Sequence, residues 1–371
     1  MKKFDKDRLL LAAAGPVLAL VSAFVLTMIV LAASGVDPID PLRIMFEQAG
    51  YEDIQVLILN QAGIYYLAAL AVAIGFRMNL FNIGVDGQYR LAAMISAVIG
   101  AAVTLPGPLQ ILMIVAVAML TGAFWAGIAG ILKAKRGVSE VVSTIMLNAI
   151  ATSLIAWLLL PKNLGVQLPG SNDLTTGDIP ESGWFPAVEI GPGLEIYGFT
   201  FVAFALGVVY WFVLNRTRFG FDLRATGASE SAAQASGVDA KKMIMTSMLI
   251  SGAVAGLTGM PLLLGESHTY NLSFPAGIGF TGITIALLGR NNPLGIFFSA
   301  LLIAFIDKAS AGLDTAGYAK EIGTIMQGLI VIAVVVSYEF VRRYGIRRQQ
   351  QKVGAELAAG HAIKTDKEVA A

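Results

Sequence analysis

The sequence predicts an all-α integral membrane protein with about ten transmembrane helices. Of its 371 residues, 56% are hydrophobic and only 14% are charged, whereas a soluble protein carries about 25% charged residues. The mean hydropathy is +0.72, and long stretches of the chain carry no charged side chain. These observations exclude a disordered chain and argue against a soluble enzyme of two domains.

Charge balance and residue usage exclude further classes of protein. The 26 Lys and Arg residues against 25 Asp and Glu residues leave no basic excess for nucleic acid. The chain has no cysteine, and its two histidines, His268 and His361, are too few for a multi-histidine metal site. The dipeptide Gly-Lys is absent, so the chain has no P-loop for ATP hydrolysis. We therefore expect no enzyme activity, no catalytic or metal-binding residues and no cofactor in this chain.

A transmembrane helix needs about 20 mostly apolar residues, so we searched for runs without charge. The run from residue 9 to residue 36 is much longer than the apolar core of a signal peptide, so it is kept as a span. The run from residue 91 to residue 132 is divided by Pro106-Gly107-Pro108 into a short and a long helix. The predicted spans are 9–34, 54–76, 90–105, 109–132, 140–161, 197–215, 243–265, 276–289, 293–307 and 321–341.

The basic residues predict the orientation of these spans. With residues 1–8 in the cytoplasm and the spans alternating, 22 of the 26 Lys and Arg residues fall in inner segments. Such a bias is typical of cytoplasmic loops, and it predicts that both termini are cytoplasmic. The transmembrane domain then covers residues 9–341, and the polar tail 342–371 is expected to be a disordered cytoplasmic segment.

Two loops are longer than simple turns. The external loop 162–196 carries four prolines and several acidic residues, and it is either a mobile connector or a docking surface for an external partner. The internal loop 216–242 contains a short helix of small residues, with Ser229 as its N-cap, Glu230 in its first turn and Gly237 as its C-terminal stop. Asp239 can cap the next span. A helix with such small side chains suits insertion into a groove on another protein, although it could also be a plain surface helix.

Polar residues inside predicted spans are costly, so each of them needs an explanation. The span 54–76 carries Asn60 and Gln61, and the span 140–161 carries Glu140, Thr144, Asn148 and Thr152 at a spacing of four, on one helix face. Such a stripe either lines a cavity or serves helix packing. The small residues between Gly252 and Gly259 predict close contact with a neighbouring helix.

Two segments combine short spans with residues that interrupt helices. They are 79–88, with the sequence Asn-Leu-Phe-Asn-Ile-Gly-Val-Asp-Gly-Gln, and 275–282, with the sequence Pro-Ala-Gly-Ile-Gly-Phe-Thr-Gly. Irregular backbone at membrane depth is tolerated where it is covered by protein or lines a cavity. Broken or re-entrant elements in both halves of a chain therefore point to a translocation pathway.

Three runs of the sequence, 79–88, 139–148 and 279–293, resemble permeases of ABC importers. The family is that of the ribose and branched-chain amino acid permeases, and the second and third runs look most like its nucleoside (simple sugar) permeases. The resemblance extends from about residue 10 to residue 343. Asp86 stands where such permeases often have Glu, and both residues are carboxylates.

The resemblance implies a set of partners. The chain would sit in the bacterial cytoplasmic (inner) membrane with a second permease subunit, either a related paralogue or a second copy. A separate ABC ATPase subunit would bind ATP and Mg, and an extracytoplasmic binding lipoprotein would deliver the small-molecule substrate. The loop 216–242 would hold the helix that couples to the ATPase, and its contact residues would be Arg224, Glu230, Ala232, Ala233, Ser236 and Gly237.

The function implied is a permease subunit that forms the pathway for a small polar solute, with nucleosides expected first. Ribose-like sugars are the alternative, and an ion-coupled secondary transporter or a membrane scaffold are the alternatives from other classes. Phe280 and Trp157 could stack on a base, although aromatic residues in spans more often serve packing. The candidate pathway residues are Asn60, Gln61, Asn82, Thr144, Asn148 and Phe280.

Overall fold

The computed structural model describes residues 6–351, except 34, 36, 168–169, 171, 320, 335, 338–339, 342, 346 and 348–349. The chain divides into a terminal unit, Met1–Leu42 with Glu321–Ala371, and a central unit, Arg43–Lys320. The terminal unit contains helix α1 (Lys6–Ala33) and an apolar helix at Glu321–Val334, where the first and last spans are predicted. Most of the predicted tail, residues 352–371, lies outside the described residues, as do residues 1–5.

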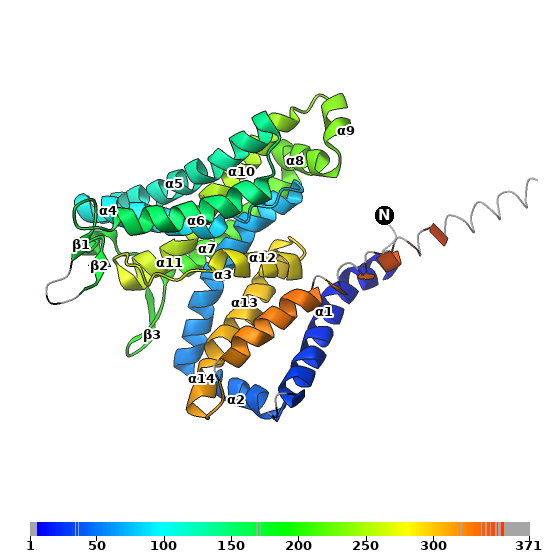
Figure 1. Cartoon of the computed structure of the whole chain (residues 1–371), viewed down its shortest axis with the longest axis horizontal. Helices are drawn as coiled ribbons and strands as arrows, with labels where there is room; N and C mark the ends of the chain where they lie inside the picture. Colours follow the sequence, from blue (N-terminus) through cyan, green and yellow to red (C-terminus); the bar gives the residue numbers. More distant parts are fainter. Residues whose placement is uncertain are drawn as a thin grey trace, which may run out of the picture. The chain divides into compact units, whose positions relative to one another are not determined.

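Six helical segments of the central unit are long and apolar enough to cross a membrane (Figure 1). Each coincides with a predicted span, and the ends differ by four residues at most, except that the last run extends to Thr315 where the predicted span ends at residue 307. They are α3 (Glu52–Arg77), α5 (Gly107–Arg136), α6 (Glu140–Leu158), α7 (Gly198–Arg216), the run Ala240–Ser267 and the run Pro293–Thr315. The run Ala240–Ser267 consists of α10 (Ala240–Gly256), a 3-10 turn (Leu257–Gly259), α11 (Met260–Leu262) and a π-helical turn (Leu263–Ser267). The run Pro293–Thr315 consists of α13 (Pro293–Ala309) and α14 (Ala311–Thr315).

The shorter predicted spans are also helical. They correspond to α4 (Val85–Ala102) and α12 (Ile278–Leu288). Directly before each of them, at 79–84 and at 268–277, the backbone forms turns and irregular structure instead of helix, as the Pro and Gly residues predict. Ten crossings and cytoplasmic termini remain predictions.

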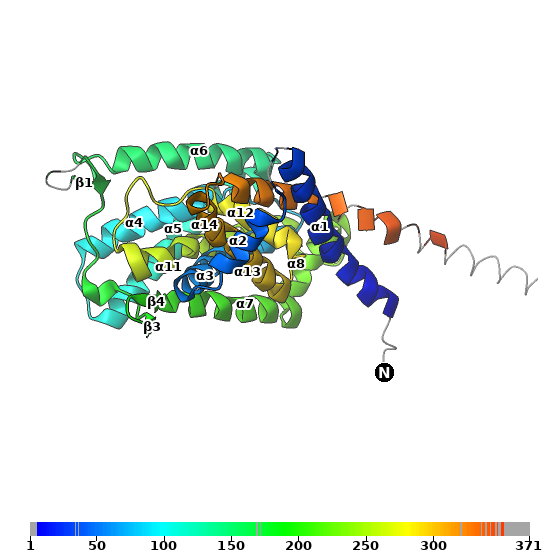
Figure 2. The same cartoon turned by 90° about the horizontal axis from the view of Figure 1, so that it is seen from below.

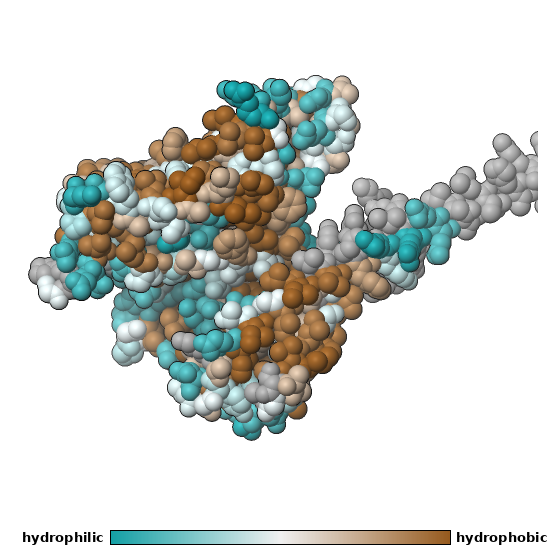
Figure 3. Space-filling view, in the orientation of Figure 1, coloured by the Kyte–Doolittle hydropathy of each residue, from teal (hydrophilic) through white to brown (hydrophobic). Residues whose placement is uncertain are grey.

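Several elements were not predicted. They are α2 (Asp40–Gln48), α8 (Arg218–Ala228), a 3-10 turn (Glu181–Gly183) and two hairpins, β1 (Val166–Gln167) with β2 (Leu174–Thr175) and β3 (Val188–Gly191) with β4 (Leu194–Ile196). In both views of the central unit, the hairpins lie at the opposite end from α8 (Figures 1 and 2). Hydrophilic residues gather at the end that carries α8 and α9 and again around the hairpins, with hydrophobic surface on the helices between them (Figure 3).

Helix α3 forms the core of the central unit. Its residues from Ala62 to Gly75 are all buried, and it packs against α7, α10, α12 and α13. A helix that is apolar all round either is covered by protein or faces lipid, and this part of α3 is covered by protein.

Helices α5 and α10 pack closely through glycines. A Cβ atom added to Gly122 would lie 2.2 Å from the carbonyl oxygen of Gly252, and one added to Gly256 would lie 2.1 Å from that of Ala118. The predicted contact face between Gly252 and Gly259 is therefore a real helix interface, in which small residues let two backbones approach.

The loop 162–196, which is predicted to be external, is folded against the segment that follows α11. Backbone N–H groups of Thr176, Ile179 and Phe185 donate to the carbonyl oxygens of Tyr270, His268 and Leu264 at 3.0, 2.9 and 2.9 Å. Between residues 172 and 196 the loop thus forms a tethered cover on this segment, and its interpretation as a mobile connector remains a prediction. Docking of an external partner on it remains a prediction.

Candidate functional site

The two interrupted segments meet at Asp86. Its carboxylate accepts hydrogen bonds from the backbone N–H groups of Gly277, at 2.7 Å, and Gly279, at 3.4 Å. Gly277 has a φ of +88°, which favours glycine, and a Cβ added to Gly279 would lie 2.4 Å from the Asp86 nitrogen. The Tyr89 hydroxyl also donates to the carbonyl of Pro275. Both glycines are therefore required where α12 begins against α4.

The position of Asp86 also places one negative charge at two helix N-termini. Asp86 lies in the first turn of α4, and its carboxylate caps the start of α12 through Gly277 and Gly279. The N-terminus of a helix favours negative charge through its unpaired N–H groups and its dipole. The side chain thus ties the two short helices together electrostatically.

A second set of polar contacts fixes the turn before α4. The amides of Asn82 and Gln88 exchange two hydrogen bonds of 2.9 Å. Asn82 also donates to the Ser251 hydroxyl at 2.8 Å, and Ser251 donates to the carbonyl of Ala71 at 2.7 Å. All four groups are buried, so the network connects α3, α4 and α10 without an unpaired amide.

The polar stripe of α6 faces the same turn. The Asn148 side chain accepts from the backbone N–H of Gly87 at 2.9 Å and donates to the carbonyl of Ile83 at 2.9 Å. The Thr144 hydroxyl donates to the carbonyl of Glu140 at 2.7 Å, and its Cβ would lie 3.0 Å from a Cβ added to Gly84. These side chains hold the backbone of residues 83–87. We call Asn82, Asp86, Gln88, Asn148 and Ser251 the polar junction.

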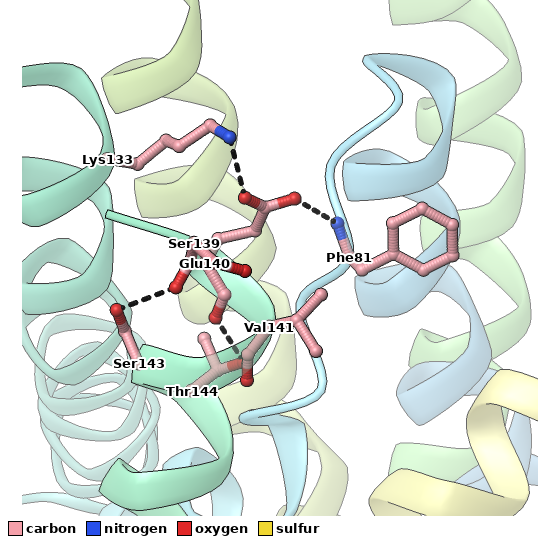
Figure 4. A network of polar contacts seen from close by, with 7 residues as sticks. All are labelled: Phe81, Lys133, Ser139, Glu140, Val141, Ser143 and Thr144. Atoms are coloured by element: carbon pink, nitrogen blue, oxygen red, sulfur yellow. Dashed lines mark hydrogen bonds and ion pairs between the residues drawn. The ribbon is translucent and has the colours of Figure 1, made fainter. Parts of the chain in front are cut away.

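Glu140 is the first residue of the polar stripe, at the end of α6 that is predicted to face the cytoplasm (Figure 4). Its carboxylate lies 2.9 Å from the Lys133 ammonium nitrogen and accepts from the backbone N–H of Phe81 at 3.4 Å. The Glu140 side chain is buried while Lys133 is partly exposed. This ion pair ties the start of α6 to the end of α5 and to the turn before α4. Removing one partner would leave a buried charge uncompensated.

Arg90 is a candidate that the sequence analysis missed. It is only 9% exposed, and its Nη1 donates to the Thr152 hydroxyl at 3.1 Å. Its Nε has no hydrogen-bond partner among the described residues. Buried polar groups without partners call for a water molecule or a ligand. Because Arg90 begins a predicted span, it looked like an ordinary interfacial cation in the sequence.

Three predicted pathway residues, Asn60, Gln61 and Phe280, take no part in the hydrogen bonds of the polar junction. The Asn60 amide donates to the carbonyl of Glu195 at 2.9 Å and accepts from the N–H of Tyr197 at 3.0 Å, so it fixes the start of α7. At 1.5 Å per residue, Asn60 lies roughly 25 Å along α3 from the turn that contains Asn82. Gln61 is half-buried, and Phe280 is 50% exposed on the first turn of α12. The structure thus brings together Asn82, Thr144 and Asn148, but not Asn60.

The inner loop has the caps that the sequence predicts. Helix α9 (Glu230–Ala235) begins at Ser229, whose hydroxyl accepts from the N–H of Ala232 at 3.3 Å. Gly237 has a φ of +85°, and Asp239 accepts from the N–H of Lys242 at 3.0 Å. The short helix and its boundaries are therefore confirmed, while its contact with an ATPase remains a prediction.

Two of the predicted contact residues on this loop are less accessible than the others. Ala233 is 3% exposed because that face of α9 packs on α8 and α10 of its own chain. The expectation that Ala233 faces a partner is wrong, since the sequence alone did not show which side of α9 is covered. Arg224 is half-buried on α8, whereas the exposed predicted residues are Glu230, Ala232, Ser236 and Gly237.

Comparison with known proteins decides the family. Residues 54–335 match the permease component of the branched-chain amino acid transport system. The chain belongs to this family. The permease is 36% identical to a guanosine ABC transporter permease of Bacillus subtilis, over 76% of this chain and 80% of that protein. It is 32% identical to a nucleoside ABC transporter permease of Lactococcus lactis, over 87% and 90% of the two chains.

A third relative is named as a sugar permease and not as a nucleoside permease. The permease is 30% identical to a glucose ABC transporter permease of Haloferax volcanii, over 91% of this chain and 90% of that protein. The shared family and the apolar helices make the chain a multi-pass permease of an ABC importer in the cytoplasmic (inner) membrane. The resemblance stated from the three sequence runs is confirmed.

Proposed function

We propose that this permease forms the pathway by which nucleosides enter the cell. The observation that carries the proposal is the identity of 36% and 32% to guanosine and nucleoside permeases over most of both chains. A nucleoside is uncharged and carries many hydrogen-bond donors and acceptors, so a pathway for it needs side chains that can donate and accept hydrogen bonds. The amides and hydroxyls around the polar junction are of this kind.

The groups that touch substrate are proposed to be those with unused hydrogen-bonding capacity. The side-chain amides of Asn82 and Asn148 form hydrogen bonds with other groups of the protein, so these two residues fix the shape of the pathway. Arg90 is different, because its Nε has no hydrogen-bond partner among the described residues. The guanidinium can donate to a base carbonyl or a ribose hydroxyl, and the exposed ring of Phe280 can stack on a base.

Energy would come from a separate ATPase subunit, which docks on the exposed face of α9. Helix α8, which precedes α9, lies against the end of α3: a Cβ added to Gly227 would be 2.6 Å from the carbonyl oxygen of Arg77 and 2.8 Å from Met78. Residue 78 begins the turn that contains Asn82 and leads to Asp86. A displacement of α9 can therefore be transmitted to the polar junction through α8 and the backbone at the end of α3, which are in close contact.

The remaining partners follow from the same family assignment. A second permease subunit, either a paralogue or another copy, would complete the pathway. An external lipoprotein would bind the substrate and release it at the tethered cover formed by residues 172–196. The permease would not need a tight site of its own, because the binding protein would provide the affinity.

Import of sugars is the second candidate function. It is favoured by the 30% identity to the glucose permease of Haloferax volcanii over 91% of this chain. An ion-coupled transporter has no comparable support, because the family matched over residues 54–335 is that of a transport-system permease component.

Uptake measurements distinguish the two substrates. We expect a strain that lacks this permease to lose uptake of labelled guanosine or uridine, and the wild-type chain to restore it. Excess unlabelled nucleoside should compete in the complemented strain, while excess glucose or ribose should not. Competition by the sugars alone would replace the nucleoside assignment with the sugar one.

A further inference from the structure

A groove between α7 and α13 lies outside the polar junction and the coupling loop. Its volume is about 360 Å³, within the range of small-molecule sites. Val208 and Leu294 form exposed edges, while Tyr66 of α3 is buried at the base. The groove is lined by Tyr66, Phe204, Gly207, Val208, Trp211, Pro293, Leu294 and Phe297.

The base of this groove is an ordered aromatic cluster. The rings of Tyr66, Phe204 and Phe297 meet edge to face, with centroids 5.0 to 6.2 Å apart. The Tyr66 hydroxyl donates to the carbonyl of Pro293 at 3.2 Å, so the one polar group of the cluster is satisfied within the protein. The groove therefore offers a rigid apolar surface that suits a hydrocarbon chain and not a nucleoside.

One end of the groove is positively charged. The guanidinium carbon of Arg216 lies 5.6 Å from the centre of the Trp211 ring, which lines the groove. Arg216 is exposed, whereas Arg218, two residues further, lies 3.8 Å from the carboxylate of Asp222. Both residues stand at the start of the loop 216–242, which is predicted to be internal, so this end faces the cytoplasmic leaflet in the predicted orientation. A Trp ring at the edge of a span is typical of headgroup depth.

We propose that the groove binds an anionic phospholipid of the cytoplasmic leaflet. One acyl chain lies on the cluster of Tyr66, Phe204 and Phe297, and the phosphate lies at Arg216. The combination of an apolar trough with a cation at headgroup depth matches both parts of such a lipid. A protein partner that binds here would also have to cover the exposed Arg216. Its binding would not require an apolar groove beside that residue.

Quenching of Trp211 by brominated lipids tests the proposal. The chain has four tryptophans, and changing Trp125, Trp157 and Trp184 to Phe leaves Trp211 as the only reporter. In bilayers that mix brominated phosphatidylglycerol or phosphatidylcholine with unlabelled lipid, we expect phosphatidylglycerol to associate about fivefold more strongly, the effect of one cation at an anionic surface. Arg216→Gln should abolish this preference. A matched chain that keeps only Trp157, which is exposed on α6, should show no preference.

Two results would overturn the proposal. Equal quenching by both lipids at Trp211 would mean that only ordinary annular lipid is present. Quenching by neither lipid would mean that a second subunit or another protein covers the groove. If the triple Phe variant does not fold, native mass spectrometry of the otherwise unchanged chain replaces it. Phosphatidylglycerol should then remain bound to the wild type and be lost from Arg216→Gln, and equal retention would contradict the proposal.

Discussion

The carboxylate of Asp86 accepts a hydrogen bond of 2.7 Å from the backbone N–H of Gly277, 191 residues further along the chain. This contact joins the two interrupted segments of the sequence, and it places one charge at the N-termini of both α4 and α12. The polar junction surrounds this contact, and the end of α3 connects it to α8 of the loop 216–242. The contact is therefore the structural centre of the proposed pathway.

Asp86→Ala is expected to destabilise the permease by about 1–3 kcal/mol, because the N–H of Gly277 is left without its acceptor. Asp86→Asn keeps an oxygen at this position and loses only the charge at the two helix ends, so its cost should be about 0.3–1 kcal/mol. Thermal unfolding of the solubilised protein measures both. Equal losses for the two variants would show that the hydrogen bond to Gly277 contributes nothing beyond the charge.

Arg90→Gln is expected to lower the initial rate of nucleoside uptake by about tenfold or more, the value of a hydrogen bond from a charged group. Arg90→Lys keeps the charge and should fall between this variant and the wild type. The amount of protein in the membrane is measured alongside uptake. If the amount falls as much as uptake does, Arg90 supports the fold and does not meet the substrate.

Asn148→Leu provides the comparison for Arg90. The side-chain amide of Asn148 binds backbone through both its oxygen, at Gly87, and its nitrogen, at Ile83, so we expect protein level and uptake to fall together. A loss of uptake with normal protein level would instead place the Asn148 side chain in the pathway itself.

Ala232→Arg is expected to prevent co-purification of the ATPase without changing membrane insertion or thermal stability, because Ala232 is exposed on α9. Ala233→Arg should lower the stability of the permease itself, since Ala233 is packed inside. Glu189→Arg on the exposed hairpin β3 is the control, and it should leave the ATPase bound. Normal ATPase binding and uptake in Ala232→Arg would remove α9 from the coupling site.

The stability of the external cover should depend on pH through His268. Its ring stacks on Trp184 at 3.9 Å, and burial lowers the pKa of His268, outweighing the carboxylates of Glu195, Asp178 and Glu266, which raise it. As pH falls through about 6.5, the unfolded state takes up the proton before the folded state does, so the free energy of unfolding decreases. At higher pH the histidine is neutral in both states and contributes no such change.

Thermal unfolding between about pH 8 and pH 5 measures this effect. His268→Gln should show a shallower loss of stability with falling pH than the wild type. Identical pH dependence in the two proteins would show that protonation of His268 is not coupled to folding.

The sequence was sufficient for the features that depend on local pattern. Charge-free runs located the long helices, and Ser229, Gly237 and Asp239 marked the ends of α9 and the start of α10 because caps act on residues close in the chain. Pro and Gly residues marked the two breaks. The glycines from Gly252 onward predicted a close helix contact, although not that Gly122 of α5 is the partner.

Features that depend on tertiary contacts could not be predicted in this way. Nothing local pairs Asp86 with Gly277, and the covered side of α9 follows from packing on α8 and α10, so Ala233 was assigned to the wrong surface. Asn60 and Asn148 looked alike as polar residues in spans, yet one fixes the start of α7 and the other the start of α4. Arg90 was overlooked because its burial is a property of the folded chain.

We propose that a separate ATPase drives the import of nucleosides through this permease. The proposal is tested most directly in proteoliposomes that contain the permease, its partner subunits and the binding protein. Labelled uridine should accumulate only with ATP at the cytoplasmic side, should still accumulate when ionophores remove all ion gradients, and should not accumulate with Ala232→Arg. Accumulation that needs no ATP and stops when the ion gradients are removed would contradict the account.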